Sequence, residues 1–388
     1  MDYLSNQNWS IPVPIRYGIG RIKELTQICN NFDISNPLLV TDKGSANLPI
    51  VQNTIAHLKN SGIAVKLFSD ISPNPKDIEI FNGKKVFLSG SHDGVIAMGG
   101  GSGMDGGKSI SLIANNDYNI WDFEWEKLPP KINNENRFPP LICIPTTAGT
   151  GAETESSAMV TDTKLLMKWC IAHPQQKPVE VILDPELTVE LPKNLTAWTG
   201  VDALVHAIEA FAVNSFHPLC DGAAIEGLRL IYPNLPVVYD KPNDMNARGK
   251  MLVGSCLAGI SFLKGLGFVH AISHMVGAEY DTQHGLTNAI VLPSVLKFNK
   301  EAIEKKIPIM CEAMELSKNS FDYFYHSICE LLDSLQIPKN LKEIGVNENS
   351  ITRLAEKALK DSAFATNPQT ATFSEMKDLI EISLNHGR

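Results

Sequence analysis

Aspartate and histidine residues gather in one stretch of the sequence. Asp202 and His206 are four residues apart, as are His270 and His274, and His284 follows soon after. Residues at i and i+4 project from one face of a helix, about one turn apart. A carboxylate with two or three imidazoles suits Zn²⁺ or Fe²⁺, and hard oxygen without thiolate favours iron. Each histidine alone is more often a core or surface residue, so the spacing leaves metal binding and packing both open.

A glycine-rich segment, GGGSGMDGGKSIS, begins at Gly99 directly after the apolar run Val95 to Met98. The run is typical of a strand and the segment then becomes helical. Unsubstituted backbone at such a junction can approach a pyrophosphate, and the helix N-terminus offers free N–H groups. We interpret the segment as a phosphate-binding loop, the alternative being a turn without a ligand. Its GxGxxG match is weak evidence, and a Walker A loop is excluded because Ser102 stands where the first glycine is required.

A second loop of small residues, PTTAGTGAE at 145–153, follows the apolar run Leu141 to Ile144. Ligands bind beyond the carboxyl ends of strands in open α/β sheets, so one extended ligand could contact both loops. Asp42, at the end of the run Pro37 to Thr41, would then accept hydrogen bonds from ribose hydroxyls and repel a 2′-phosphate. This favours NAD over NADP. The alternative for Asp42 is a plain turn or cap carboxylate.

Strands and helices alternate in the first half of the chain. Amphipathic stretches such as Ile50 to Lys59 predict helices between five expected strands, which are Pro37–Thr41, Val65–Phe68, Val95–Met98, Leu141–Ile144 and Val179–Leu183. Continuous apolar strands separated by helices predict a parallel sheet covered on both faces. Beyond Pro185 only helical spacing remains. We therefore expect an α/β dinucleotide-binding domain over 1–188 and an all-α metal-binding domain over 189–388.

Composition narrows the class of partner. The 388 residues are 44% apolar and 20% charged, which is ordinary for a soluble globular chain, and the formal charge of −9 argues against nucleic acid or an anionic membrane as partner. Seven scattered cysteines suggest a reducing compartment and no disulfide framework. The N-terminus lacks a secretory pattern, and the apolar stretch Val253 to Leu263 is far shorter than the ~20 residues of a membrane helix. A cytoplasmic protein with a small-molecule substrate is expected.

The chain resembles the iron-containing, or group III, alcohol dehydrogenases over nearly its whole length. The motifs that carry the resemblance are TDKG near 42, DGVIAMGGGSGMDGGKSIS at 93–111, PTTAGTGAE at 145–153, LDPELTVELP at 183–192, GVDALVHAIEAF at 200–211, GLGFVHAISHMVGAEYDTQHG at 265–285 and TNPQTATFSEMKDLI at 366–380. The resemblance implies metal ligands at Asp202, His206, His270 and His284. It also implies cofactor contacts from Asp42, Gly99, Gly100, Ser102, Asp105, Thr146, Thr147, Thr150 and Lys168, and a homodimer or larger homo-oligomer.

The expected reaction is hydride transfer between a primary or small alcohol and NAD. A metal, Fe²⁺ or alternatively Zn²⁺, would polarise the substrate oxygen, and the nicotinamide would take the hydride. The resemblance places His274 close to the nicotinamide, and an imidazole can relay the alcohol proton near neutral pH. The alternative for His274 is a packing role. Gly103, Met275 and Gln283 stand where many family members have proline, which bears on substrate range rather than chemistry.

Three other functions stay open from the sequence. Polyol oxidation of the glycerol dehydrogenase type would use the same groups. A lyase of the dehydroquinate synthase type would need several basic residues near the metal to hold a phosphorylated, carboxylated substrate, and only Lys264 and Arg229 lie near the ligand motifs. A sensor or structural protein that binds NAD or metal is the non-enzymatic alternative. NADH formation from NAD and a panel of primary alcohols distinguishes the alcohol dehydrogenase from the lyase and from the sensor or structural protein.

Overall fold

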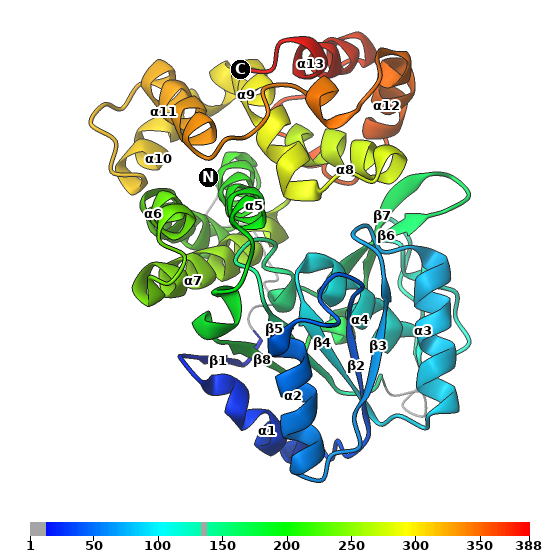
Figure 1. Cartoon of the computed structure of the whole chain (residues 1–388). Coiled ribbons are helices and arrows are strands. Elements are labelled where there is room, and N and C mark those ends of the chain that lie inside the picture. Colours follow the sequence, from blue (N-terminus) through cyan, green and yellow to red (C-terminus); the bar gives the residue numbers. More distant parts are fainter. Residues whose placement is uncertain (1–12, 133–137) are drawn as a thin grey trace. The chain divides into compact units, whose positions relative to one another are not determined.

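The computed structural model describes residues 13–132 and 138–388, which divide into two compact units (Figure 1). The α/β unit comprises Val13–Thr147 and Ala152–Glu190. The helical unit comprises Ala148–Gly151 and Leu191–Arg388. The chain therefore contributes a four-residue segment to the helical unit from within the α/β region. Residues 133–137 of the polar loop at 129–140 lie outside the described part.

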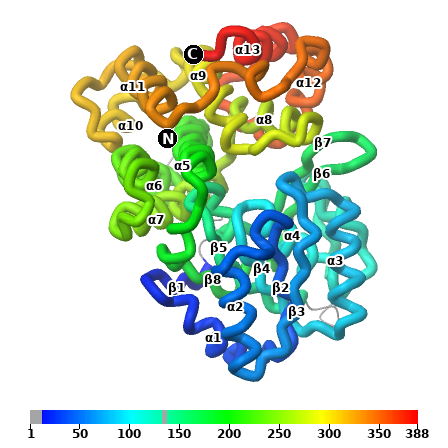
Figure 2. Tube along the Cα trace, viewed as in Figure 1, coloured from blue at the N-terminus to red at the C-terminus, as the bar shows by residue number. Residues whose placement is uncertain are grey.

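A six-stranded parallel sheet forms the centre of the α/β unit. In spatial order its strands are β1 (Ile15–Tyr17), β8 (Glu180–Leu183), β5 (Leu141–Pro145), β4 (Gly94–Gly99), β2 (Pro37–Asp42) and β3 (Lys66–Ile71). Figure 2 shows the green β8 beside the blue β1, although most of the unit separates them in sequence. The parallel sheet predicted from the sequence is confirmed, and its five predicted strands are β2, β3, β4, β5 and β8.

Helices cover both faces of this sheet, which explains why its strands are continuous apolar runs. Ile96 and Met98 of β4 share a core cluster with residues of α2 (Pro49–Asn60). Ala97, whose side chain points the other way, lies against Gly107 of α4 (Gly101–Ile113). The helices α1 (Leu25–Asn31) and α3 (Asp77–Ser89) complete the set. The amphipathic stretch that begins at Ile50 is therefore a helix, as predicted.

Two features of the α/β unit were not predicted. β1 has only three residues, too few for a period to show. β6 (Ser157–Asp162) and β7 (Met167–Ala172) form an antiparallel two-stranded sheet instead of a helix between β5 and β8. Val160 and Ile171 are buried, as expected for strands with one face packed. This hairpin carries Lys168 on β7.

The helical unit contains no strand from residue 191 to 388, a range that the structure describes in full. Its helices are α5 (Lys193–Ala212), α6 (Pro218–Asp240), α7 (Met245–Ser261), α8 (Phe268–Tyr280), α9 (His284–Ile303), α10 (Ile307–Ala313), α11 (Phe321–Ser334), α12 (Ile351–Ala358) and α13 (Phe373–Asn385). From residue 199 to 212 every residue of α5 is buried. This helix is therefore central to the unit, and the all-helical prediction is confirmed.

No single helix among the described residues is long and apolar enough to cross a bilayer. Only Met245–Lys264 and Phe268–Tyr280 together have the length and composition of a span, and this pair is bent by 102°. The stretch from Val253, expected to be a buried helix, lies mostly within α7.

Candidate active site

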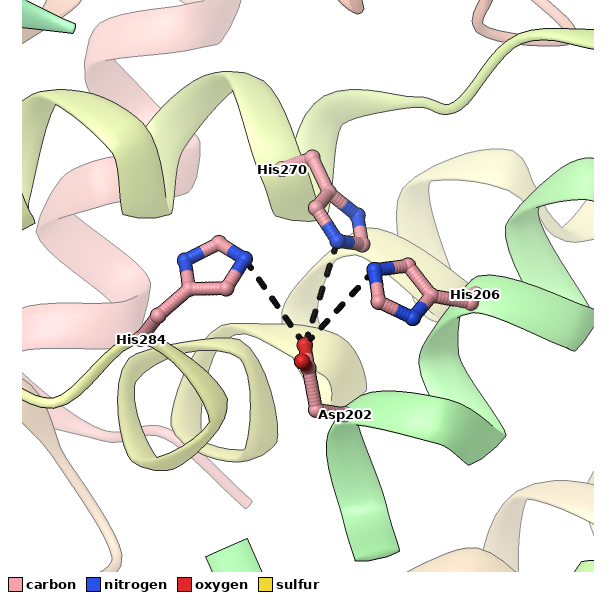
Figure 3. A group of neighbouring side chains, drawn as sticks. All are labelled: Asp202, His206, His270 and His284. Carbon is pink, nitrogen blue, oxygen red and sulfur yellow. Dashed lines mark ion pairs between the residues drawn. The ribbon is translucent and has the colours of Figure 1, made fainter. Parts of the chain in front are cut away.

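Four side chains of the helical unit converge on one point. Asp202, His206, His270 and His284 each offer a ligand atom, and these atoms all lie within 4.8 Å of one another. The Oδ1 atom of Asp202 lies 3.9, 4.0 and 3.7 Å from the Nε2 atoms of His206, His270 and His284. Figure 3 shows the three imidazoles turned toward this carboxylate. The structure thus brings together the four residues that the sequence singled out as metal ligands.

Three helices position the cluster. Asp202 and His206 lie one turn apart on α5, His270 lies in the first turn of α8, and His284 is the first residue of α9. Gly285 lets α9 approach α5 closely, because a Cβ at this position would lie 2.2 Å from the carbonyl oxygen of Trp198. A larger residue at 285 would therefore push His284 away from Asp202.

Gln283, a position at which the resemblance suggests proline, caps the helix that carries His284. Its side-chain Oε1 accepts a hydrogen bond of 2.7 Å from the backbone N–H of Leu286 and so caps the start of α9. The bond satisfies one of the backbone N–H groups that have no partner within the helix. The side chain of Gln283 thus supports the start of the helix that begins with His284.

Three polar residues that sequence reasoning missed contact the histidines or the aspartate of this region. Glu209 lies 2.6 Å from Nδ1 of His270, and the amide nitrogen of Asn288 donates to Oδ1 of Asp202 at 2.6 Å. The same amide nitrogen is 3.2 Å from Nε2 of both His270 and His284. The third residue, Asp361, contacts His274. Glu209 and Asn288 had a usable signal, since they lie one turn from His206 and from His284 in sequence.

Burial dominates the electrostatics of His206. The residue is 4% exposed, and burial lowers the pKa of His206 to about 4 although the Asp202 carboxylate opposes this. His206 is therefore neutral near pH 7. A neutral imidazole keeps a lone pair free for a metal ion.

His274 lies beside the cluster rather than in it. Its ring stacks on that of His284 with centroids 5.3 Å apart and rings inclined by 13°. Its Nδ1 atom lies 2.9 Å from Oδ2 of Asp361, and both residues are buried. Asp361 also accepts the backbone N–H of Ala363 at 2.8 Å. The carboxylate therefore fixes the ring and directs Nε2 away from itself.

The glycine loop of the α/β unit lies at the carboxyl ends of adjacent strands. Gly99 ends β4 and Gly100 is the N-cap of α4. The backbone N–H of Thr146 donates to the carbonyl of Gly99 at 2.9 Å, and a Cβ on Gly100 would lie 3.3 Å from Cγ2 of Thr147. These four predicted cofactor contacts therefore lie together at a helix N-terminus, which suits a phosphate group.

Asp42 lies at the end of β2, next to this loop. A Cβ on Gly99 would be 3.3 Å from Oδ2 of Asp42. The carboxylate accepts hydrogen bonds from the backbone N–H and the hydroxyl of Ser45, at 3.0 and 2.7 Å. It is only partly buried, so lone pairs stay accessible to a ligand hydroxyl. The turn role and the ligand role of Asp42 are thus compatible.

Ser102, Asp105 and Lys168 lie around the first turns of α4. The hydroxyl of Ser102 donates to the carbonyl of Pro73 at 2.5 Å, and the ammonium of Lys168 donates to the side chain of Asn74 at 3.3 Å. Burial raises the pKa of Asp105, while Lys108 and Lys168 act in the opposite direction. The positive charge of Lys168 is therefore close to the helix that begins at the glycine loop.

Thr150 differs from the other predicted cofactor contacts. It belongs to the segment 148–151, which packs within the helical unit, whereas the others belong to the α/β unit. The structure therefore brings eight of the nine positions into one unit and not the ninth.

Comparison with known proteins matches both the α/β region and the helical region to one protein family. Residues 12–185 match the family model "Iron-containing alcohol dehydrogenase", and residues 196–384 match "Fe-containing alcohol dehydrogenase family, C-terminal". The chain belongs to the iron-containing alcohol dehydrogenase family. It is accordingly an oxidoreductase that interconverts an alcohol and a carbonyl compound, and membership implies a nicotinamide cofactor and a metal ion. The resemblance found in the sequence is thereby confirmed.

The relatives of this alcohol dehydrogenase align over almost the whole chain. A 1,3-propanediol dehydrogenase of Citrobacter freundii is 34% identical, with 94% of this chain and 95% of the relative covered. An NAD-dependent methanol dehydrogenase of Bacillus methanolicus is 33% identical, with 97% and 100% covered. An NADPH-dependent butanol dehydrogenase of Clostridium saccharobutylicum is 32% identical, with 96% and 97% covered. A crystal structure of a 1,3-propanediol oxidoreductase has a TM-score of 0.90 at 32% identity, with 97% and 99% covered.

Proposed function

We propose that the protein is an NAD-dependent alcohol dehydrogenase that holds Fe²⁺ through Asp202, His206, His270 and His284. Its substrates are small, primary alcohols and their aldehydes. Residues 1–188 form the NAD-binding domain and 189–388 the metal-binding and catalytic domain. The enzyme acts in the cytoplasm as a homodimer or a larger homo-oligomer. The observation that carries the proposal is the convergence of one carboxylate oxygen and three imidazole nitrogens within 4.8 Å.

The donor set of the cluster fits a divalent transition metal. Four deprotonated or neutral ligands carry a single negative charge, and burial keeps His206 neutral. The set contains oxygen and nitrogen without sulfur, which favours iron, while Zn²⁺ accepts the same ligands. When bound, the metal supplies Lewis-acid chemistry to the substrate oxygen and the nicotinamide supplies the hydride acceptor.

The residues of the chain have separate roles in this proposal. The Asp42 carboxylate binds the ribose hydroxyls, and the loop from Gly99 to Ser102 receives the pyrophosphate at the N-terminus of α4. His274 relays the alcohol proton through Nε2, while Asp361 holds Nδ1 at 2.9 Å. The Asp42 carboxylate would repel a 2′-phosphate, so NAD is the preferred cofactor although one relative uses NADPH.

The two basic residues near the ligand motifs are already paired with carboxylates, which argues against the lyase alternative. The ammonium of Lys264 forms an ion pair with Asp221, and the guanidinium of Arg229 forms one with Glu226. Neither cation is therefore left over to hold a phosphorylated, carboxylated substrate. Polyol oxidation uses the same groups as alcohol oxidation and differs only in substrate range.

One assay tests the proposal. Protein purified without air, and loaded with Fe²⁺ or Zn²⁺, is mixed with NAD and a panel of primary alcohols and polyols, and NADH is followed by its absorbance. We expect NADH with primary alcohols and loss of the signal after chelation of the metal. NADH that persists after complete metal removal, or none with any alcohol, would contradict the proposal. Size-exclusion chromatography with light scattering tests the oligomer.

A further inference from the structure

Glu209 joins two helices of the metal centre through one buried carboxylate. The residue lies on α5 and is 5% exposed. Its Oε1 atom accepts the backbone N–H of Val269 at 2.8 Å. Its Oε2 atom accepts the backbone N–H of Gly267 at 3.0 Å and lies 2.6 Å from Nδ1 of His270. One side chain thus contacts both the start of α8 and a residue of the metal cluster.

The carboxylate serves first as the cap of α8. The first N–H groups of a helix have no partner within the helix, and a negative charge at this end is favourable. Gly267, the N-cap residue, has no side chain to supply the cap. A Cβ there would lie 2.8 Å from Oε1 of Glu209, so the glycine is what lets the carboxylate reach the helix.

The same carboxylate determines which nitrogen of His270 carries the proton. A carboxylate accepts hydrogen bonds, so Nδ1 at 2.6 Å must be the protonated nitrogen and donates to it. The lone pair then lies on Nε2, the atom that faces Asp202. A carboxylate on the far nitrogen also makes a ligating imidazole more basic. For comparison, Nδ1 of His284 lies 3.4 Å from the neutral hydroxyl of Ser273.

We propose that Glu209 is a positioning residue of the metal centre, which fixes the tautomer and orientation of His270 and thereby raises the affinity of the site for a divalent metal. The inference rests on the proposed metal site. One residue, Glu209, thus both caps the start of α8 and keeps Nε2 of His270 deprotonated and oriented for the metal. The inference predicts that metal affinity depends on the charge of Glu209 more than on the stability of the helix.

The test uses Glu209→Gln in the full-length protein. Glutamine keeps the shape, but its single oxygen can replace only one of the two carboxylate oxygens, and the charge is lost in either orientation. We measure the dissociation constant of Zn²⁺ by competition with a chromophoric chelator, the absorption spectrum of bound Co²⁺, and the melting temperature. We expect Zn²⁺ to bind roughly 10- to 100-fold more weakly, as is typical for partners of ligating histidines, with an altered Co²⁺ spectrum.

Asn367→Ala is the matched control. Its Oδ1 accepts the backbone N–H of Phe268 at 3.1 Å, so it caps the same helix, while its other hydrogen bonds go to Asn299 and Gln369. We expect this variant to melt at a lower temperature and to bind Zn²⁺ and Co²⁺ like the wild type. A Glu209→Gln protein with wild-type affinity and spectrum would leave only a helix cap and overturn the inference. Equal weakening by Asn367→Ala would overturn it too, because affinity would then follow helix stability.

Zn²⁺ binding by the wild-type protein distinguishes a failure of the proposed enzyme activity from a failure of the proposed role of Glu209. If wild-type protein binds Zn²⁺ and Glu209→Gln weakens the binding while Asn367→Ala does not, the inference holds even if no alcohol is oxidised. If the wild type fails to bind Zn²⁺ or Co²⁺, the proposed metal centre and the role of Glu209 both fall.

Discussion

The Nδ1 atom of His274 lies 2.9 Å from Oδ2 of Asp361, although 87 residues separate them in sequence. Both side chains are buried, and the His274 ring stacks on that of His284. The pair therefore holds an oriented imidazole against a residue of the metal cluster. Such a ring suits proton transfer, but it would also suit packing.

His274→Ala separates these two roles. Loss of a general acid or base typically lowers the rate by ~10²-fold or more, so we expect at least this loss of kcat with unchanged metal content. Asp361→Asn, which keeps the ring but removes the charge behind it, should give a smaller loss. Metal analysis and kcat are measured on the same preparations. Weaker metal retention with a near-normal rate per bound metal would show that His274 only packs.

Asp202→Ala and His284→Ala should abolish metal retention and turnover but leave NAD binding intact. Both residues belong to the helical unit, whereas Asp42 and the glycine loop belong to the α/β unit. Metal content is measured by elemental analysis and NAD binding by calorimetry. His217→Ala is the control, because His217 caps α6 and is not a member of the cluster. A variant that keeps one metal per chain and a normal rate would remove its residue from the site.

Asp42→Gly should relax the preference for NAD. The change removes a carboxylate that would oppose a 2′-phosphate, and such like-charge contacts can cost several kcal/mol. The ratio of kcat/KM for NAD and NADP is measured in the wild type and the variant. Asp70→Asn, which removes an exposed carboxylate on the neighbouring strand β3, should leave that ratio unchanged. Equal use of both cofactors by the wild type would show that Asp42 does not contact the ribose.

Because Glu155 is buried, we expect the free energy of unfolding to fall as the pH rises into the alkaline range. Burial raises its pKa to about 8, with Lys108 opposing, from 4.5 for an exposed glutamate. The folded protein thus keeps this proton over a range in which the unfolded chain has lost it. The stabilisation is complete below pH 4.5 and disappears as the pH rises through about 8, at a cost of a few kcal/mol. Glu153, whose burial raises its pKa to about 7, contributes in the same direction.

Glu155→Gln removes the ionisation, so its melting temperature should fall less than that of the wild type between pH 6 and pH 9. Glu356→Gln, an exposed change on α12, should behave like the wild type. Parallel curves for wild type and Glu155→Gln would mean that Glu155 does not control this transition.

Patterns within short segments predicted much of the fold and of the metal cluster. Asp202 and His206 share a face as soon as their segment is helical, so their spacing was sufficient to pair them. The continuous apolar runs were likewise sufficient to predict strands of a sheet covered on both faces. His270 and His284 follow in the same stretch of the sequence, and the resemblance then implied that all four residues are metal ligands. What escaped depends on contacts between distant segments. Nothing near Asp361 in the sequence pointed to His274.

Other misses had a signal that the sequence reading did not use. Glu209 follows His206 by three residues, and Asn288 follows His284 by four, so each shares a helix face with a metal-cluster histidine. The partners Asp202 and His270 lie on other helices, however, and a helix face alone does not show which distant residues it contacts. The hairpin of β6 and β7 was missed for a similar reason, because its alternation is short and lies between runs that predicted a regular α/β pattern.

The order of the strands has a consequence for folding during synthesis. β8 lies between β1 and β5 in the sheet, so the chain must be synthesised as far as residue 183 before β1 can pair with a neighbouring strand. Residues 148–151 likewise emerge before the helices they pack with. Pairings between distant segments form slowly, and incomplete sheets expose edges that favour aggregation. A nascent chain that pauses before residue 180 should therefore be bound by chaperones, because its sheet still lacks β8 between β1 and β5.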